Sequence, residues 1–113
     1  MIRKNEFQLF QSILQECLQN QTTLEGFLEN RNIFFIKRFL YFLDTQKTSF
    51  QLFTSIKNRL YEQLIRHEKN PSNLRNYAYH LLTHYYNQAQ YIERANFFLR
   101  EAYQLETPLF ITH

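Results

Sequence analysis

The sequence contains little of what β-sheets and their tight turns are made from. Its 113 residues include one glycine, two prolines and no valine. Strands favour β-branched residues, and two-residue hairpin turns depend on glycine. A single glycine also excludes a glycine-rich phosphate-binding loop. We therefore expect an all-α protein.

Long apolar runs and paired cysteines are also missing. No run approaches the ~18 apolar residues that a membrane helix needs, and the opening MIRKNEFQLF has no signal-peptide core. Cys17 is the only cysteine, so an internal disulfide is excluded and a reducing compartment is the simple interpretation. The sequence thus predicts a cytoplasmic protein that has no membrane contact.

Charge gives little support for a nucleic-acid partner. Thirteen Lys and Arg against ten Asp and Glu leave a net charge of +3. Nucleic-acid binders gather their cations on one face, whereas here most cations have an acidic neighbour within a turn or two. We expect no nucleic-acid binding by this chain alone. The rival interpretation, a nucleic-acid-associated helical protein, needs a basic stripe that joins Lys37, Arg38, Arg94 and Arg100.

Aromatic residues are abundant instead. There are twelve Phe and eight Tyr, and 44% of all residues are hydrophobic, which excludes disorder. Apolar residues recur at three- and four-residue steps, the period of amphipathic helices. This period predicts helices over 4–20, 31–44, 49–68, 72–88 and 90–106, with a short or weak one around Gly26. We expect a single domain, 1–113, of five to six antiparallel helices stacked as helical hairpins.

The segment 31–44 is apolar nearly all the way round. Such a helix is either central to the core or covered by another chain. In a short chain one helix is rarely covered on every side, so we predict a homodimer. The predicted interface residues are Phe34, Phe35, Phe39 and Phe42. If these rings belong to the core instead, a charged substitution there will abolish folding.

The stretch 72–106 resembles a tetratricopeptide-type helical hairpin. The residues that carry the resemblance are Leu81, Tyr85, Tyr91, Ala95, Leu99, Ala102 and Pro108. Small residues at 95 and 102 let the first helix of the pair approach closely, while Leu99 fills the gap between them.

A second resemblance covers more of the chain. FFIKRFLYFLDTQKTSFQLF (34–53) and NLRNYAYHLLTHYYNQAQYIERANFFLREA (73–102) resemble the C-terminal regulatory domain of Rgg/GadR/MutR-type peptide-sensing transcription regulators of low-GC Gram-positive bacteria. The resemblance implies a right-handed stack of helix pairs, dimerisation and a concave surface that binds a short signalling peptide. It implies no catalysis.

One polar row is the candidate binding surface. On an ideal helix over 73–88, Asn76, His80, Thr83 and Asn87 lie opposite the apolar face, and Tyr79 and Tyr86 flank them. Asn amides satisfy both the N–H and C=O groups of an extended peptide, and Tyr rings add contact area at low entropic cost. The alternative is an ordinary solvated face.

The sequence contains no residue pattern typical of a catalytic or metal-binding site. His80 and His84 point two imidazoles along one side of a helix, but no Glu follows His80 and no third ligand is near in the sequence. Cys17 lies on an apolar stripe with no activating neighbour, which favours a buried packing role. We predict no catalytic residue, no metal and no cofactor.

The leading hypothesis is therefore a non-enzymatic regulatory module that self-associates and binds a short peptide or a partner helix. A first rival is a stand-alone helical antitoxin, immunity factor or anti-regulator that masks a partner's surface. A flat apolar surface around 34–42 favours masking, and a concave surface lined by Asn76, His80 and Asn87 favours peptide binding.

Overall fold

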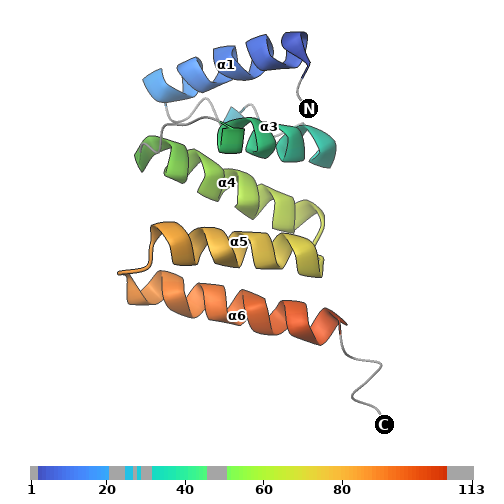
Figure 1. Ribbon diagram of the computed structural model, residues 1–113, viewed down its shortest axis with the longest axis vertical. Coiled ribbons are helices and arrows are strands. Elements are labelled where there is room, and N and C mark those ends of the chain that lie inside the picture. Colours follow the sequence, from blue (N-terminus) through green and yellow to red (C-terminus); the bar gives the residue numbers. More distant parts are fainter. Residues whose placement is uncertain (1–2, 21–24, 27, 29–31, 46–50, 107–113) are drawn as a thin grey trace. The chain divides into compact units, whose positions relative to one another are not determined.

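The computed structural model describes residues 3–20, 25–26, 28, 32–45 and 51–106, and all regular structure in these ranges is helical. The helices are α1 (Lys4–Gln19), α3 (Ile33–Thr45), α4 (Gln51–His67), α5 (Pro71–His84) and α6 (Ala89–Glu106) (Figure 1). The prediction of an all-α protein is confirmed. None of these helices has the length and apolar character needed to cross a bilayer.

Four of the five predicted helix ranges agree with the observed ones to within two residues, but α5 is shorter than predicted. It ends at His84, where the Tyr85 N–H still donates to the Leu81 carbonyl oxygen at 2.8 Å. Residues 85–88 then turn, because the Gln88 N–H donates back to the Tyr85 carbonyl oxygen at 3.1 Å. Of the weak helix expected around Gly26, only Glu25, Gly26 and Leu28 are described, and they are helical.

The chain divides into two compact units, Met1–Gln63 and Leu64–His113, and the boundary falls inside α4. The core of the first unit is a cluster of phenylalanine rings. Phe10 of α1 stacks on Phe39 of α3 with ring centroids 5.3 Å apart, and lies 5.5 Å from Phe42. Phe39 and Phe42 are completely buried.

This burial corrects the predicted dimer interface. The side chains of Phe39 and Phe42 are covered by other residues of their own chain, so they cannot also contact a second copy. Phe35 is half-buried, with its ring 5.4 Å from that of Phe10. Of the four predicted residues only Phe34 lies well exposed, at 74%. The apolar residues of α3 therefore lie mainly on its core face, and Phe34 lies on its exposed edge.

Polar contacts also join the elements of the first unit. The Arg38 guanidinium donates through Nη2 and Nε to the two carboxylate oxygens of Glu6, at 2.7 and 2.9 Å. This forked bond lowers the pKa of Glu6 below its ordinary value. On the other side of α3, Lys57 Nζ lies 2.8 Å from Asp44 Oδ1. These pairs link α3 to both α1 and α4.

In the second unit, the start of α5 follows from its sequence. Pro71 is the first helical residue, where its missing N–H costs nothing. The side chain of Asn70 accepts a hydrogen bond from the Asn73 N–H at 2.8 Å, which is a typical N-cap. The buried Asn73 amide in turn donates to the Glu68 carbonyl oxygen at 2.8 Å.

Helices α5 and α6 lie side by side along their length (Figure 1). Ala95 and Ala102 of α6 are completely buried. Tyr77 of α5 stacks on Phe98 of α6 at 5.2 Å, and Tyr85 stacks on Tyr91 at 4.3 Å. Two ion pairs, Lys69–Glu101 and Arg75–Glu106, add to the contact.

Candidate functional site

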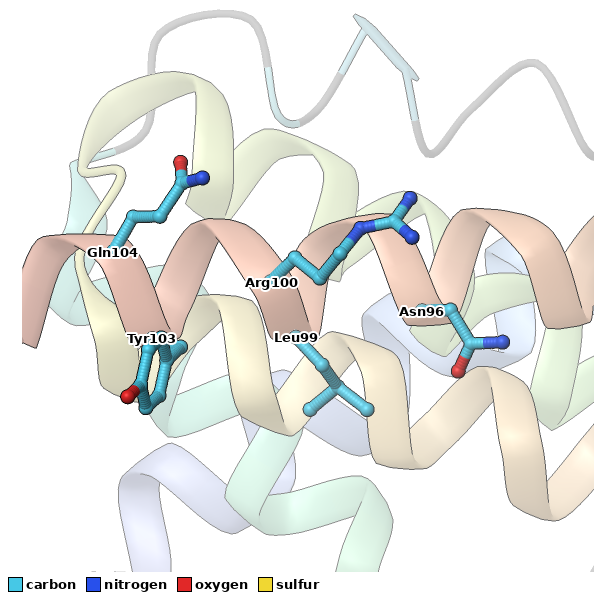
Figure 2. Close-up of a pocket in the computed structure, with 5 residues that line it drawn as sticks. All are labelled: Asn96, Leu99, Arg100, Tyr103 and Gln104. Carbon is cyan, nitrogen blue, oxygen red and sulfur yellow. The ribbon is translucent and has the colours of Figure 1, made fainter.

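The outer side of α6 carries a hollow of about 640 Å³ in the second unit. Figure 2 shows the five described residues that line it, which we call the α6 face: Asn96, Leu99, Arg100, Tyr103 and Gln104. Leu99 and Tyr103 project to one side of the helix in this view, and Arg100 and Gln104 to the other. The hollow thus has an apolar edge and a polar edge.

Helical spacing explains why these residues share a face. They stand at steps of three, one, three and one, so they cover a broad strip of the helix surface. Ala95 and Ala102 are buried, and the α6 face lies beside them on the helix surface, beginning at Leu99. Leu99 is half-buried, while Tyr103 is 63% exposed. A large aromatic ring is therefore presented to the surface of the unit.

The chemistry of the α6 face suits a peptide-like ligand. Leu99 and the Tyr103 ring offer apolar area, and burial of such groups supplies most of the free energy of association. Asn96 and Gln104 each carry an amide that can donate and accept, and Arg100 adds five donors and a permanent positive charge. Together these groups can satisfy both the side chains and the backbone of a bound segment.

The structure brings only part of the predicted polar row to the surface. Asn76, Tyr79 and Thr83 are exposed on α5, and Tyr86 and Asn87 are exposed in the turn that follows it. His80 is 6% exposed, so its predicted place in the lining of a groove is wrong. Its ring lies 6.4 Å from Tyr77 and 6.1 Å from Tyr85. His80 is thus a core residue of the second unit.

Sequence reasoning missed the α6 face because it assigned Leu99 to the contact with the preceding helix. In the structure Phe98, one residue earlier, stacks on Tyr77, and the half-buried Leu99 also lines the hollow. A signal was present in the pattern. Leu99 and Tyr103 stand four residues apart, on a strip that adjoins the buried alanines.

The two histidines of α5 lie close together. The ring centroids of His80 and His84 are 5.0 Å apart. Within the ranges that the structure describes, no three His, Cys, Asp or Glu residues gather as ligands would. Cys17 is buried in the first unit, and burial raises the pKa of its thiol. Its predicted packing position is confirmed.

The cations considered for nucleic-acid binding are divided between the two units. Lys37 and Arg38 belong to the first unit, and Arg94 and Arg100 to the second. Arg38 is engaged with Glu6, and the Arg94 guanidinium lies 5.5 Å from the centre of the Tyr91 ring. Arg100 is the cation that lines the hollow.

Comparison with protein-family models, with curated proteins and with solved structures gives no match for this chain. Its function must therefore be argued from its own residues.

Proposed function

We propose that the chain is a non-enzymatic protein-interaction domain that binds a short peptide or a partner helix through the α6 face. The observation that carries the proposal is the hollow itself, which combines an exposed aromatic ring, a half-buried leucine and two side-chain amides on one helix. In this proposal the work of the protein is equilibrium binding, without bond making or breaking.

The arrangement of α5 and α6 supports a tetratricopeptide-type, antiparallel hairpin as the framework. Three contacts order the two helices: Tyr85 with Tyr91, Tyr77 with Phe98 and Arg75 with Glu106. In these pairs the residue number on the α5 side decreases as the number on α6 increases, which is the order expected of antiparallel helices. Ala95 and Ala102 occupy the positions where a close helix contact needs small side chains.

The resemblance of residues 34–53 and 73–102 to the regulatory domain of peptide-sensing transcription regulators gives the proposal a biological setting. A domain of that kind senses a short peptide and passes the signal on through its assembly. The α6 face has the chemistry for the peptide, because it offers apolar area beside amides that can pair with an extended backbone.

A selection experiment with matched variants tests this proposal. Peptides enriched from a random display library against the full chain are titrated against wild type, Tyr103→Glu and Tyr79→Glu. Both substitutions exchange an exposed tyrosine for a charge, at 63% and 54% exposure. We expect Tyr103→Glu to weaken binding by about tenfold or more, which corresponds to ~1.4 kcal/mol, and Tyr79→Glu to leave it unchanged. The reverse pattern would contradict the proposal and favour the exposed row on α5.

A second candidate function, self-association or masking of another protein, is favoured by the outer edge of α3. Phe34 and Tyr41 are 74% and 48% exposed, and their spacing of seven places them on one side of the helix. Light scattering coupled to size exclusion tests self-association. We expect about twice 14.0 kDa for wild type and a single chain mass for Phe34→Asp. A monomeric wild type would contradict self-association, and the masking of a foreign partner would then be the use of this edge.

A further inference from the structure

The hollow on the α6 face carries a positive charge that no lining residue balances. Arg100 is the charged member of the five described residues that line it, and the others are neutral. We propose that the α6 face binds protein segments in which a large apolar side chain stands beside an aspartate or glutamate, with the carboxylate held by Arg100. This inference rests on the proposed function, because it names the class of peptide that the same surface takes.

The acidic residues of α6 do not neutralise Arg100. Glu101, the next residue, is engaged by Lys69, whose Nζ lies 2.6 Å from Glu101 Oε2. Glu93 stands seven residues before Arg100, about 10.5 Å away along the helix axis, which is roughly the screening length of 0.1 M salt. The ion pairs formed between described residues do not include Arg100. Its guanidinium is therefore available to an anion that a ligand brings.

The polar edge of the hollow has donors for both oxygens of a carboxylate. Arg100 and Gln104 project to the same side of α6 (Figure 2), and residues four apart on a helix have Cβ atoms about 5–6 Å apart. A guanidinium can donate two parallel N–H bonds to one carboxylate, and such charge-assisted bonds are about twice as strong as neutral ones. The Gln104 amide adds a further N–H donor beside them.

The apolar edge of the hollow sets the second requirement on the ligand. Leu99 and Tyr103 project to the other side of the helix from Arg100, and the Tyr103 side chain is 63% exposed. An exposed ion pair contributes little affinity by itself, whereas burial of apolar surface drives association. The ligand therefore needs a large apolar side chain that covers Leu99 and Tyr103 while its carboxylate reaches Arg100.

Two other occupants fit this face less well. A symmetric pair of α6 helices centred on the hollow places residue 100 on the two-fold axis, since Asn96 and Gln104 lie equally far from it. Arg100 would then oppose Arg100 of the other copy, and two like charges at short range repel. A single strand of nucleic acid repeats its phosphates at every nucleotide and needs a groove with many cations, whereas Arg100 is the one cation among the described lining residues.

Selection of peptides against charge variants of the full chain tests the proposal. A random display library is selected against wild type, Arg100→Glu and Arg94→Glu. Arg94 is the matched control, because it is an exposed arginine of the same helix that lies outside the hollow, about 120° around the axis from Arg100. Both substitutions change the net charge of the chain equally. We expect wild type and Arg94→Glu to enrich Asp or Glu beside apolar residues, and Arg100→Glu to enrich Lys or Arg there.

Titration of one selected peptide makes the test quantitative. An acidic peptide from the wild-type selection is synthesised with an amidated C-terminus, and again with Lys in place of its acidic residue. We expect wild type to bind the acidic version at least about tenfold more tightly than the Lys version, and Arg100→Glu to reverse this preference, which also shows that the variant is folded. The same preference in wild type and Arg100→Glu would overturn the proposal. So would an equal change in Arg94→Glu, or a wild-type selection without acidic enrichment.

The remaining outcomes identify what fails. Displacement of the peptide by a thymidine oligonucleotide would overturn the proposal in favour of nucleic acid, and a wild-type dimer that Tyr103→Glu dissociates would overturn it in favour of a second copy. If Tyr103→Glu abolishes peptide binding while Arg100→Glu has no effect, this inference fails and the proposed function stands. If neither substitution alters peptide binding, the α6 face is not the peptide site and both fail.

Discussion

The phenylalanines of α3 show how residues of one type take opposite roles within a single helix. Phe39 is completely buried against Phe10, whereas Phe34, five residues earlier, is 74% exposed. A fully buried ring contributes through both the apolar area removed from water and its close packing. An exposed ring contributes little to the free energy of folding, but its surface is accessible to a partner. The number of aromatic residues alone therefore does not separate core from binding surface.

This difference gives a paired prediction. Phe39→Ala leaves a cavity among packed rings and should lower the free energy of unfolding by about 3–5 kcal/mol. Phe34→Ala, on the same helix, should change it by less than about 0.5 kcal/mol. Urea unfolding followed by circular dichroism measures both. Comparable losses in the two variants would show that α3 is not oriented as described.

Tyr61 provides a pH-dependent prediction. Burial, with a smaller effect of the charge on Asp44, raises the pKa of Tyr61 to about 12, from the ordinary value of 10. The folded chain holds this proton more tightly than the unfolded chain, so the stabilisation is complete below pH 10 and is lost as pH rises through 10 to 12. Tyr61→Phe should lessen the alkaline loss of stability, and the exposed control Tyr79→Phe should not. Identical alkaline melting curves for wild type and Tyr61→Phe would contradict this.

At the scale of elements, the sequence predicted most helix positions because apolar periodicity is a property of the local sequence. The end of α5 was missed because residues 85–88 contain neither glycine nor proline. Stacking of Tyr85 on Tyr91, a contact between two elements, accompanies the turn there. Pro108, one of the residues that carry the resemblance to a tetratricopeptide-type hairpin, lies outside the described residues.

The candidate sites were harder to predict than the helices, because they depend on packing as well as on the local sequence pattern. An ideal-helix projection places His80 among polar neighbours, but rings from its own helix and the following turn surround it. The same projection places Phe98 and Leu99 on either side of the buried alanines, so it could not decide which of them packs on Tyr77. Periodicity gives the faces of a helix, and only packing decides which neighbour covers each face.

The close contact between α5 and α6 can be tested with one substitution at two positions. Ala95 is completely buried, so Ala95→Glu forces a charge and extra volume into that contact. We expect a loss of at least about 3 kcal/mol in unfolding free energy or a failure to fold. Ala89→Glu, at the exposed first turn of the same helix, should be neutral or slightly stabilising. Unchanged thermal stability of Ala95→Glu would contradict the helix pairing.

For the molecule as a whole, both units expose large apolar side chains on described helices. The first unit presents Phe34 and Tyr41 on α3, and the second presents the α6 face. Both surfaces lie on helices whose opposite sides are anchored in a core. A binding surface on such an element keeps its shape when a ligand arrives, which limits the entropy lost on association.

Binding of a peptide to the α6 face can be observed directly by mapping backbone amide chemical shifts in the full chain as a library-selected peptide is added. We expect the largest changes at residues 96–104 of α6, with Asn96, Arg100 and Gln104 among them. The exposed α5 residues Asn76, Tyr79 and Thr83 should change little. Shifts that gather on α5 instead, or that spread evenly over the chain, would contradict the assignment of binding to the α6 face.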